Sequence, residues 1–328
     1  MHAWVLFESP GTYRWGEVED PPLRAGEVRV RVVVSALNHM DLWVARGLPK
    51  PNLPHVPGAD AAGVVAELGT GVTSCAVGDE VVVDPTVCRP EAIAALGIDA
   101  PVAKGTEIVG EHRWGAHGGS LVVPARNVVR RPDGRSWAEC AAYPTAYVTA
   151  WRALRRTRVA AGEVLLIVGF GSGVSVAALA IARHLGAEVH ITSRDATKRS
   201  VALTLGATAA HDSGAERWEV EADVVLESVG PATWEKSVQA LRRGGRLAVC
   251  GSTSGRTVEL HMPTLFFRQL EVIGSTMGSG EEFAEVTDAV ADGLAVQVDA
   301  EYPLAAYPEA LDRLEAGDQL GKLVLHHE

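Results

Sequence analysis

The sequence is poor in cysteine, in positive charge and in long apolar runs. Its four cysteines, at positions 75, 88, 140 and 250, form no Cys-x-x-Cys pair, which favours reduced structural thiols over a disulfide framework or a zinc knot. Thirty Lys and Arg against 41 Asp and Glu give a net charge of −11, so nucleic-acid phosphates and anionic bilayers would be repelled. Apolar runs such as 164–168 are strand-sized and far short of the about 20 residues of a membrane-spanning helix.

The beginning of the chain and the overall composition predict an ordinary globular protein. The opening MHAWVLFESPG is typical of a first strand and does not have the basic, apolar and small-residue regions of a signal peptide. We therefore expect a cytoplasmic protein with no nucleic-acid or membrane partner. With 328 residues, 47% hydrophobic and 22% charged, the chain is long enough for two domains and a sizeable core.

Two different patterns follow one another along the chain. The first third contains short β-branched runs broken by Gly and Pro, such as EVRVRVVVSAL and GDEVVVDP, which indicate a compact, barrel-like β domain. After about residue 138 strand-like and helix-like segments alternate, which is the pattern of a parallel sheet with crossover helices. From about residue 287 a helix and a final strand follow, and we expect that strand to rejoin the first domain.

A glycine-rich loop, VGFGSGVS at 168–175, joins a buried strand to a helix. The continuous apolar run 164–168 is typical of a strand covered on both faces, and the segment after the loop has helical periodicity up to a predicted cap at Gly186. Small residues at this place allow the backbone to approach a pyrophosphate, whose charge meets the first amides of the helix. A glycine turn alone is weak evidence, but its position among successive strand and helix units predicts a dinucleotide site.

Several further segments carry a family pattern together with the glycine-rich loop. They are ALNHMDLWVARG (36–47), HVPGADAAGVVAELGTGVTSCAVGDEVVV (55–83), GEHRWGAHGGSLVVP (110–124), VLESVGPATWEKSVQALRRGGRLAVCG (225–251), FFRQLEVIGSTMGS (266–279) and GKLVL (321–325). Taken together, these segments resemble the medium-chain dehydrogenase/reductase superfamily, in its zinc-independent quinone-oxidoreductase-like branch. Members of that branch often have G-x-G-S-G-V-S in the loop, so Val174 does not imply lost binding.

The resemblance implies an α/β fold made of two domains. A doubly wound Rossmann parallel sheet is expected over 147–287, and a GroES-like β-barrel substrate domain over 1–146 and 288–328. Relatives pair their Rossmann sheets edge to edge, and the apolar segment LEVIGSTM is a candidate for such an edge. We therefore expect a homodimer, with a tetramer as the alternative.

The end of the second Rossmann strand predicts which nicotinamide coenzyme is bound. NAD sites place an acidic residue there for the ribose hydroxyls, whereas NADP sites place a cation for the 2′-phosphate. Here the strand EVHIT ends in Ser193 and Arg194, and Lys198 follows one helical turn later. This pattern favours NADP(H), and the adjacent Asp195 keeps NAD(H) as the alternative.

The residues that correspond to zinc ligands in the family do not favour a metal. Relatives with catalytic zinc use Cys or Asp and His side chains, and this chain has Asn38, Ala59 beside Asp60, and Thr145 at the matching places. A tetrahedral catalytic site needs three thiolate, imidazole or carboxylate ligands, so we expect no zinc. Of the cysteines that bind structural zinc in relatives only Cys88 remains, and whether it binds a metal with His112 and His117 is left open, as their spacing repeats no known zinc pattern.

Without a metal, hydrogen-bond donors must stabilise the charge that develops on the substrate. By the resemblance, Asn38, Asp41 and Thr145 are the catalytic candidates: Asn38 as a neutral donor, Asp41 as a catalytic or bracing carboxylate, and Thr145 as a hydroxyl donor or a space filler. The coenzyme candidates cover the loop, the second strand end, the edge of the sheet and family-matched positions. They are Thr149, Gly169, Gly171, Ser172, Gly173, Val174, Ser193, Arg194, Lys198, Gly251, Ser252, Phe267, Thr276 and Lys322.

These observations lead to one functional prediction and two alternatives. We expect an NADPH-dependent oxidoreductase that transfers hydride to a quinone, an enone or another activated carbonyl compound without zinc. One alternative is an NAD(P)-dependent alcohol dehydrogenase that binds a metal through other ligands. The second is a coenzyme-binding structural or stress protein with vestigial activity. The sequence does not identify the substrate, because pocket shape alone shifts selectivity by only about a few kcal/mol.

Overall fold

The computed structural model describes residues 1–327 and divides the chain into two compact units. The first unit comprises residues 1–148 together with the chain from residue 278 on, and the second comprises residues 149–277. No helix in the described residues is both long enough and apolar enough to span a bilayer. The helix α4 (Pro144–Arg156) contains residues of both units.

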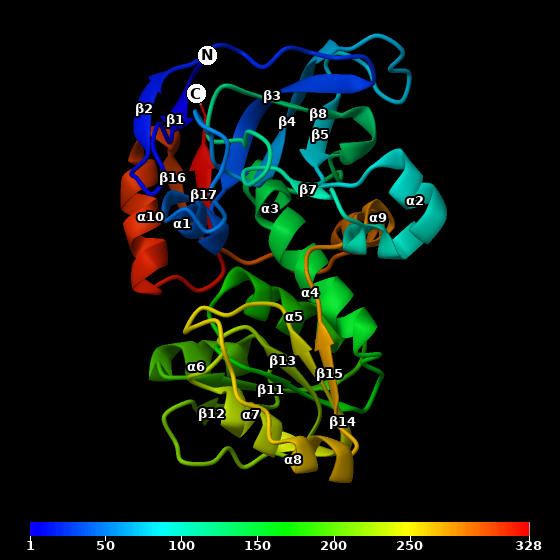
Figure 1. The fold of residues 1–328 in the computed structure, drawn as a ribbon, viewed down its shortest axis with the longest axis vertical. Helices are drawn as coiled ribbons and strands as arrows, with labels where there is room; N and C mark the ends of the chain where they lie inside the picture. Colours follow the sequence, from blue (N-terminus) through cyan, green and yellow to red (C-terminus); the bar gives the residue numbers. More distant parts are fainter. Residues whose placement is uncertain (328) are drawn as a thin grey trace. The chain divides into compact units, whose positions relative to one another are not determined.

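The second unit is built on a six-stranded parallel sheet (Figure 1). Its strand order, β12-β11-β10-β13-β14-β15, places the first strand in the middle, as in dinucleotide-binding Rossmann domains. A helix joins each pair of consecutive strands that are neighbours in the sheet, because parallel neighbours need crossover connections. The strands are β10 (Val164–Ile167), β11 (Glu188–Ser193), β12 (Ala209–Asp212), β13 (Ala222–Glu227), β14 (Leu241–Val249) and β15 (Glu271–Gly274); the helices are α5 (Gly173–His184), α6 (Ala196–Thr204), α7 (Trp234–Ala240) and α8 (Met262–Phe267).

Buried aliphatic residues from the central strands form the core of this unit. Leu166, Val225 and Leu247 come from β10, β13 and β14 and are fully buried. Trp218 and Trp234 extend the same cluster. The central strands read as continuous apolar runs because helices cover both faces of a parallel sheet. The predicted doubly wound sheet is therefore confirmed.

The first unit contains a seven-stranded sheet centred on β3 (Glu27–Ala36). This strand is paired antiparallel with β4, β8 and β17, so segments from the two ends of the chain lie side by side (Figure 1). The other strands of the sheet are β4 (Asp60–Leu68), β5 (Glu80–Val83), β8 (Ser120–Pro124), β9 (Val128–Arg130), β16 (Val298–Pro303) and β17 (Lys322–His326). Two small sheets pair β1 (His2–Val5) with β2 (Arg14–Glu17), and β6 (Thr86–Val87) with β7 (Glu107–Ile108).

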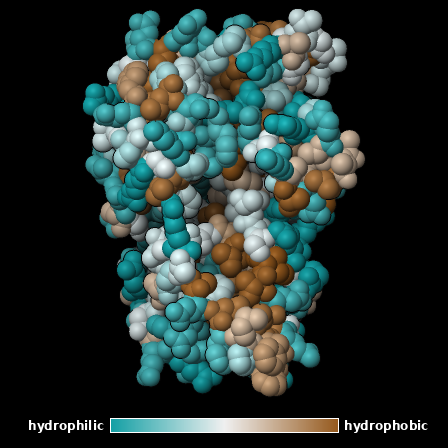
Figure 2. Space-filling model, in the orientation of Figure 1, coloured by the Kyte–Doolittle hydropathy of each residue, from teal (hydrophilic) through white to brown (hydrophobic). Residues whose placement is uncertain are grey.

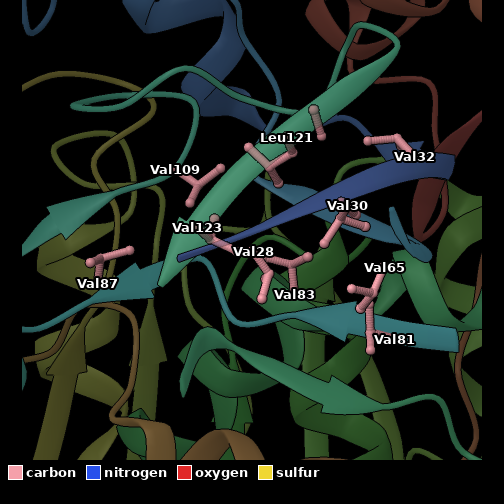
Figure 3. Packing of buried hydrophobic residues seen from close by; sticks show 12 residues of the cluster. Val28, Val30, Val32, Val65, Val81, Val83, Val87, Val109, Leu121 and Val123 are labelled. Carbon is pink, nitrogen blue, oxygen red and sulfur yellow. The ribbon is translucent and has the colours of Figure 1, made fainter. Parts of the chain in front are cut away.

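Alternation along β3 explains the core of the first unit. Val28, Val30 and Val32 are buried and point to one face, while Arg29 and Arg31 occupy the intervening positions. Valines and a leucine from neighbouring strands pack against that face (Figure 3). The helices of the unit are α1 (His39–Ala45), α2 (Pro90–Leu96), α3 (Trp137–Ala142), α9 (Gly280–Ala291) and α10 (Tyr307–Ala316), with short 3-10 helices at η1 (Gly97–Val102), η2 (Ala125–Asn127) and η3 (Leu304–Ala306).

The compact units and the predicted domains differ most at their second boundary, where the chain returns to the first unit. The sequence prediction kept residues up to 287 in the Rossmann domain, whereas the contacts place α9 in the first unit. The reason is side-chain packing: the Tyr143 hydroxyl lies 3.0 Å from Thr287 Oγ1, and its ring stacks on Phe283. Such contacts between distant segments have no local pattern in the sequence.

Candidate active site

The segment from Asn38 to Asp41 contains the N-cap and the first turn of α1. The fully buried carboxylate of Asp41 accepts the backbone N–H of Asn38 at 2.8 Å and that of Gly58 at 3.1 Å. The first of these bonds is the carboxylate half of a capping box, which satisfies a backbone donor at the helix start. Asp41 therefore lies where it braces the Asn38 backbone.

Asp60, at the first position of β4, connects two of the predicted catalytic residues. Its carboxylate is fully buried; Oδ2 accepts Asn38 Nδ2 at 2.9 Å, and Oδ1 accepts the backbone N–H of Thr145 at 2.8 Å. The hydroxyl oxygen of Thr145 is shielded from solvent and has no hydrogen-bond partner among the described residues. Asp60 thus binds both Asn38 and Thr145. The Asn38 amide keeps a second N–H, and the Thr145 hydroxyl keeps its proton, for a further hydrogen bond.

Lys322, at the start of β17, completes this cluster. Its ammonium group donates to the backbone oxygen of Leu37 at 2.5 Å, to Asn38 Oδ1 at 2.7 Å and to Asp60 Oδ2 at 2.7 Å. The side chain is 3% exposed, and these three acceptors account for all three ammonium protons. The same contacts fix the amide of Asn38, because Lys322 requires its oxygen and Asp60 requires its nitrogen.

Nearby aromatic and imidazole groups are held neutral. Burial, together with the positive charge of Lys322, lowers the pKa of His39. Tyr143 and Tyr147 are fully buried, and burial raises the pKa of both hydroxyls. The Tyr147 hydroxyl donates to the backbone oxygen of Ala295, and the Tyr143 hydroxyl is hydrogen-bonded to Thr287. Both hydroxyls are therefore engaged by groups outside the cluster around Asp60.

The donor set around Asp60 does not fit a catalytic zinc ion. Asn38 offers an amide, Thr145 a hydroxyl, and Asp60 a carboxylate already paired with the Lys322 ammonium. A zinc site needs deprotonated thiolate, neutral imidazole or carboxylate ligands, and a fixed ammonium at 2.7 Å from the carboxylate repels a dication. Across residues 1–327, no group of three or more His, Cys, Asp and Glu side chains is arranged to hold a metal.

The other metal candidates lie apart in separate hydrogen-bonding environments. Cys88 accepts a long contact from Thr106 Oγ1 at 3.9 Å, and His112 Nδ1 accepts the backbone N–H of Ile108. His117 is fully buried with Nδ1 at 2.9 Å from Ser35 Oγ. Within the described part of the chain these three side chains do not form a ligand set.

A chain of imidazole and hydroxyl groups joins the last strand to the centre of the first unit. The Ser35 hydroxyl lies 2.9 Å from His117 Nδ1 and 2.8 Å from His327 Nε2, and His327 Nδ1 donates to the backbone oxygen of Gly118 at 3.0 Å. Since Nδ1 of His327 donates, its Nε2 accepts from Ser35 in the neutral ring. Burial, reinforced by His117, lowers the pKa of His327 to about 3.

This lowered pKa predicts that acid destabilises the protein. In the unfolded chain His327 is protonated below its ordinary pKa of 6.5, whereas in the folded protein it stays neutral until about pH 3. The unfolded state therefore binds more protons in this range, and the free energy of unfolding decreases as the pH falls from 6.5 to 3. The melting temperature should therefore decrease between pH 8 and pH 5, and less steeply in His327→Gln. An equal slope in wild type and variant, measured by differential scanning fluorimetry, would contradict this assignment.

In the second unit, the glycine-rich loop has the backbone geometry of a phosphate cradle. Gly169 and Gly171 have φ values of +78° and +133°, which side chains rarely adopt. A Cβ on Gly171 would lie 2.9 Å from Cδ and 3.0 Å from Nζ of Lys198. Ser172 caps α5 by accepting the N–H of Ser175, while the N–H groups of Gly173 and Val174 at the first helical positions have no intrahelical acceptor. These features fit a coenzyme pyrophosphate.

Basic side chains cluster after β11, where the coenzyme ribose is expected. Asp195 accepts the N–H groups of Thr197 and Lys198 as the cap of α6, and these bonds lower its pKa. Arg199 donates to the backbone oxygen of Ser193 at 2.6 Å. Arg194 is exposed. The acidic group in this segment is thus engaged by backbone amides, and an exposed cation is next to it.

The remaining coenzyme candidates lie in different environments. Gly251 follows β14 and lies so close to the residue after β13 that a Cβ would be 2.8 Å from the backbone oxygen of Ser228. Thr149 is buried, whereas Ser252 and Thr276 are exposed, and Phe267 is 67% exposed at the end of α8. Gly169 to Ser172 form one loop and Gly173 and Val174 begin α5, whereas these five positions lie in or after other elements.

Sequence reasoning did not select Asp60 as a site residue. A signal was present: Asp60 is the one charged residue in VPGADAAGVVA, and a carboxylate in an apolar strand must be paired when buried. Lys322 in GKLVL carries the same signal. The pairing itself is hidden in the sequence, because the two residues are 262 positions apart.

Comparisons with known proteins match both parts of the chain. The family model described as alcohol dehydrogenase GroES-like domain matches residues 24–133, and the model described as zinc-binding dehydrogenase matches residues 173–292. An alcohol dehydrogenase of Geobacillus stearothermophilus is 29% identical and covers 99% of each chain. The chain is also 32% identical to part of the polyketide synthase GfsB of Streptomyces halstedii, of which it spans only 6%.

Solved structures show the same fold. An NAD-dependent alcohol dehydrogenase superimposes with a TM-score of 0.93 at 35% identity, covering 99% of both chains. The 2-octenoyl-CoA carboxylase reductase CinF, in complex with NADP and 2-octenoyl-CoA, gives 0.89 at 25% identity over 96% of this chain and 82% of the other. With its GroES-like domain and its Rossmann-type sheet, this chain belongs to the medium-chain dehydrogenase/reductase superfamily and is a nicotinamide-dependent oxidoreductase.

Proposed function

We propose that the protein is an NADPH-dependent reductase of activated carbonyl compounds, such as quinones and enones, and that it works without zinc. The observation that carries this proposal is the cluster in which Lys322 and Asp60 fix the amide of Asn38. The coenzyme supplies hydride when it is bound. The protein's part is to hold both reactants and to stabilise negative charge on the substrate oxygen.

Two neutral groups can stabilise that charge. Asn38 Nδ2 donates one proton to Asp60 and has a second, and the Thr145 hydroxyl has no partner among the described residues. Neutral donors stabilise a developing oxyanion less than a metal does, so they suit substrates that conjugation has already activated. The similarity to CinF, whose complex holds the conjugated thioester 2-octenoyl-CoA, supports the same substrate class.

The loop after β10 and the segment after β11 would bind the coenzyme. The first amides of α5 suit the pyrophosphate, and Arg194 with Lys198 suits a 2′-phosphate because guanidinium and ammonium groups form strong bonds to phosphate. Asp195 is engaged as a helix cap, which leaves its carboxylate a weaker acceptor for the ribose hydroxyls of NAD. These contacts favour NADPH over NADH.

Replacing Arg194 by alanine tests this coenzyme preference. A lost charge-assisted hydrogen bond is worth about 1.5–3 kcal/mol, so Kd for NADPH should rise about tenfold or more while Kd for NADH stays the same. Fluorescence titration of the reduced coenzymes measures both values. Arg217→Ala, an exposed arginine in the same unit, is the matched control and should leave both values unchanged. An equal loss of both coenzymes in Arg194→Ala would refute the assignment.

The second candidate function is an NAD-dependent alcohol dehydrogenase. The observation that favours it is the 35% identity to the structure of that name. Turnover of the purified protein distinguishes the two, using NADPH and NADH with a quinone, a cyclic enone, an enoyl thioester and an aldehyde. Oxidation of NADPH by the first three supports the proposal. Preference for NADH with the aldehyde would support the second candidate, and binding without turnover would indicate a vestigial activity.

We also propose that two copies associate through the free edge of the parallel sheet. β15 is the edge strand, and exposed apolar side chains gather over β15 and α8 (Figure 2). These are Met262, Phe266, Phe267 and Val272, each at least 41% exposed. An unpaired apolar edge favours pairing with an identical edge. Sedimentation velocity should show a dimer in wild type and a monomer in Val272→Lys; a wild-type monomer would refute the proposal.

A further inference from the structure

The ammonium group of Lys322 lies in the polar cluster that contains Asn38, Asp60 and Thr145. It is 2.7 Å from both Asn38 Oδ1 and Asp60 Oδ2, and Asp60 in turn accepts the N–H of Thr145. By the resemblance to the family, Asn38 and Thr145 occupy positions at which zinc-dependent relatives would have ligands. A fixed positive charge is therefore present inside the donor set that would otherwise surround a metal.

The contacts of Lys322 are internal to the first unit. All three of its protons are donated to protein acceptors, and the side chain is 3% exposed. The resemblance to the family suggested a contact with the coenzyme for this residue. Binding of a phosphate by the same ammonium would require at least one of these three bonds to break, and the lost partner would be a buried carboxylate, amide or carbonyl oxygen.

The geometry points to Lys322 as an internal cation that takes the place of the metal and orients Asn38 for the substrate. Lys322 holds the amide oxygen, so the amide nitrogen faces Asp60 and keeps one proton for a substrate oxygen. Polarisation of the amide oxygen by the ammonium also strengthens the N–H donors of the same group. Lys322 is in this view a positioning residue, and the catalytic contact is made by Asn38. This inference rests on the proposed function in one respect, since the proposed function identifies a substrate oxygen as the group that Asn38 contacts.

Chemical rescue of Lys322→Ala tests the internal cation. The variant leaves a space of about one propylamine chain and an Asp60 without its counter-ion, so its melting temperature and kcat should both fall, the latter by about tenfold or more. Ethylammonium chloride should raise both values in the variant, whereas ethanol at the same concentration should not. Lys236→Ala is the matched control, since the Lys236 ammonium binds the backbone oxygens of Ser213 and Ala215 in the other unit. It should keep the wild-type kcat and show no response of kcat to the amine.

A double variant separates orientation of Asn38 from simple charge compensation. Lys322→Ala with Asp60→Asn removes both charges and should regain most of the lost melting temperature. If Lys322 orients Asn38, kcat stays low in the double variant; a return to the wild-type kcat would overturn the proposal. The double variant also serves if Lys322→Ala alone does not fold.

The melting temperature of Lys322→Ala tests the internal cation independently of the proposed function. If wild type reduces none of the quinones, enones and thioesters, the proposed function fails, but amine-specific stabilisation of Lys322→Ala would still support the internal cation. Equal stabilisation by ethanol and ethylammonium, or the same amine effect on Lys236→Ala, would overturn it.

Discussion

Replacing Asn38 by leucine should lower kcat for a cyclic enone by about 100-fold or more, because removal of one oxyanion donor typically costs about 10²–10³ in kcat. Leucine is close in shape and has no donor, so the Asp41 brace on the backbone is preserved. Kd for NADPH should stay at the wild-type value, since the amide of Asn38 is bound within the first unit by Lys322 and Asp60.

Single-turnover kinetics with saturating NADPH measures this effect on the reduction step itself. The exposed Asn52 gives a matched control, because Asn52→Leu is the same substitution at a position outside the cluster around Asp60. A variant Asn38→Leu with wild-type kcat and a raised KM would mean that Asn38 contributes only to substrate binding.

Gly171→Val should abolish measurable NADPH binding, with Kd rising by about 100-fold or more through loss of charge-assisted hydrogen bonds to the pyrophosphate. Gly171 has φ of +133°, and a Cβ there would lie 2.9 Å from the Lys198 side chain. The valine therefore strains the backbone of the cradle and displaces a cation next to it.

A second glycine separates binding from folding in this experiment. Gly162 also has a positive φ, of +80°, in the same unit, but no atom lies within 4 Å of a Cβ built on it. Gly162→Val should lower the melting temperature without changing Kd for NADPH, as measured by isothermal titration calorimetry. Wild-type affinity in Gly171→Val would contradict the assignment of the loop as the phosphate cradle.

Local sequence patterns predicted the parallel sheet and its glycine loop well. Continuous apolar runs such as 164–168 indicate strands covered on both faces, and the helix that follows has clear periodicity. The alternation of these elements leaves few possible sheet topologies, because crossover connections are right-handed and short. The fold class is confirmed for these physical reasons.

The polar cluster could be predicted only in part. Asn38 and Thr145 were selected by their positions in family segments, and the N-x-x-D spacing of Asn38 and Asp41 is itself a signal for a helix start. The role of Asp60 could not be predicted, because its partner Lys322 is 262 residues away and pairing depends on β3 lying between β4 and β17. Contacts that depend on sheet order have no short-range sequence pattern.

In the proposed mechanism, neutral donors held by Lys322 and Asp60 replace zinc in NADPH-dependent reduction. Its most direct test is NADPH oxidation with an enone by protein that has been washed with a strong chelator and assayed for metal by mass spectrometry. We expect unchanged kcat with zinc far below one ion per chain, and no increase when zinc is added. Loss of activity on chelation, with recovery on stoichiometric zinc, would contradict it.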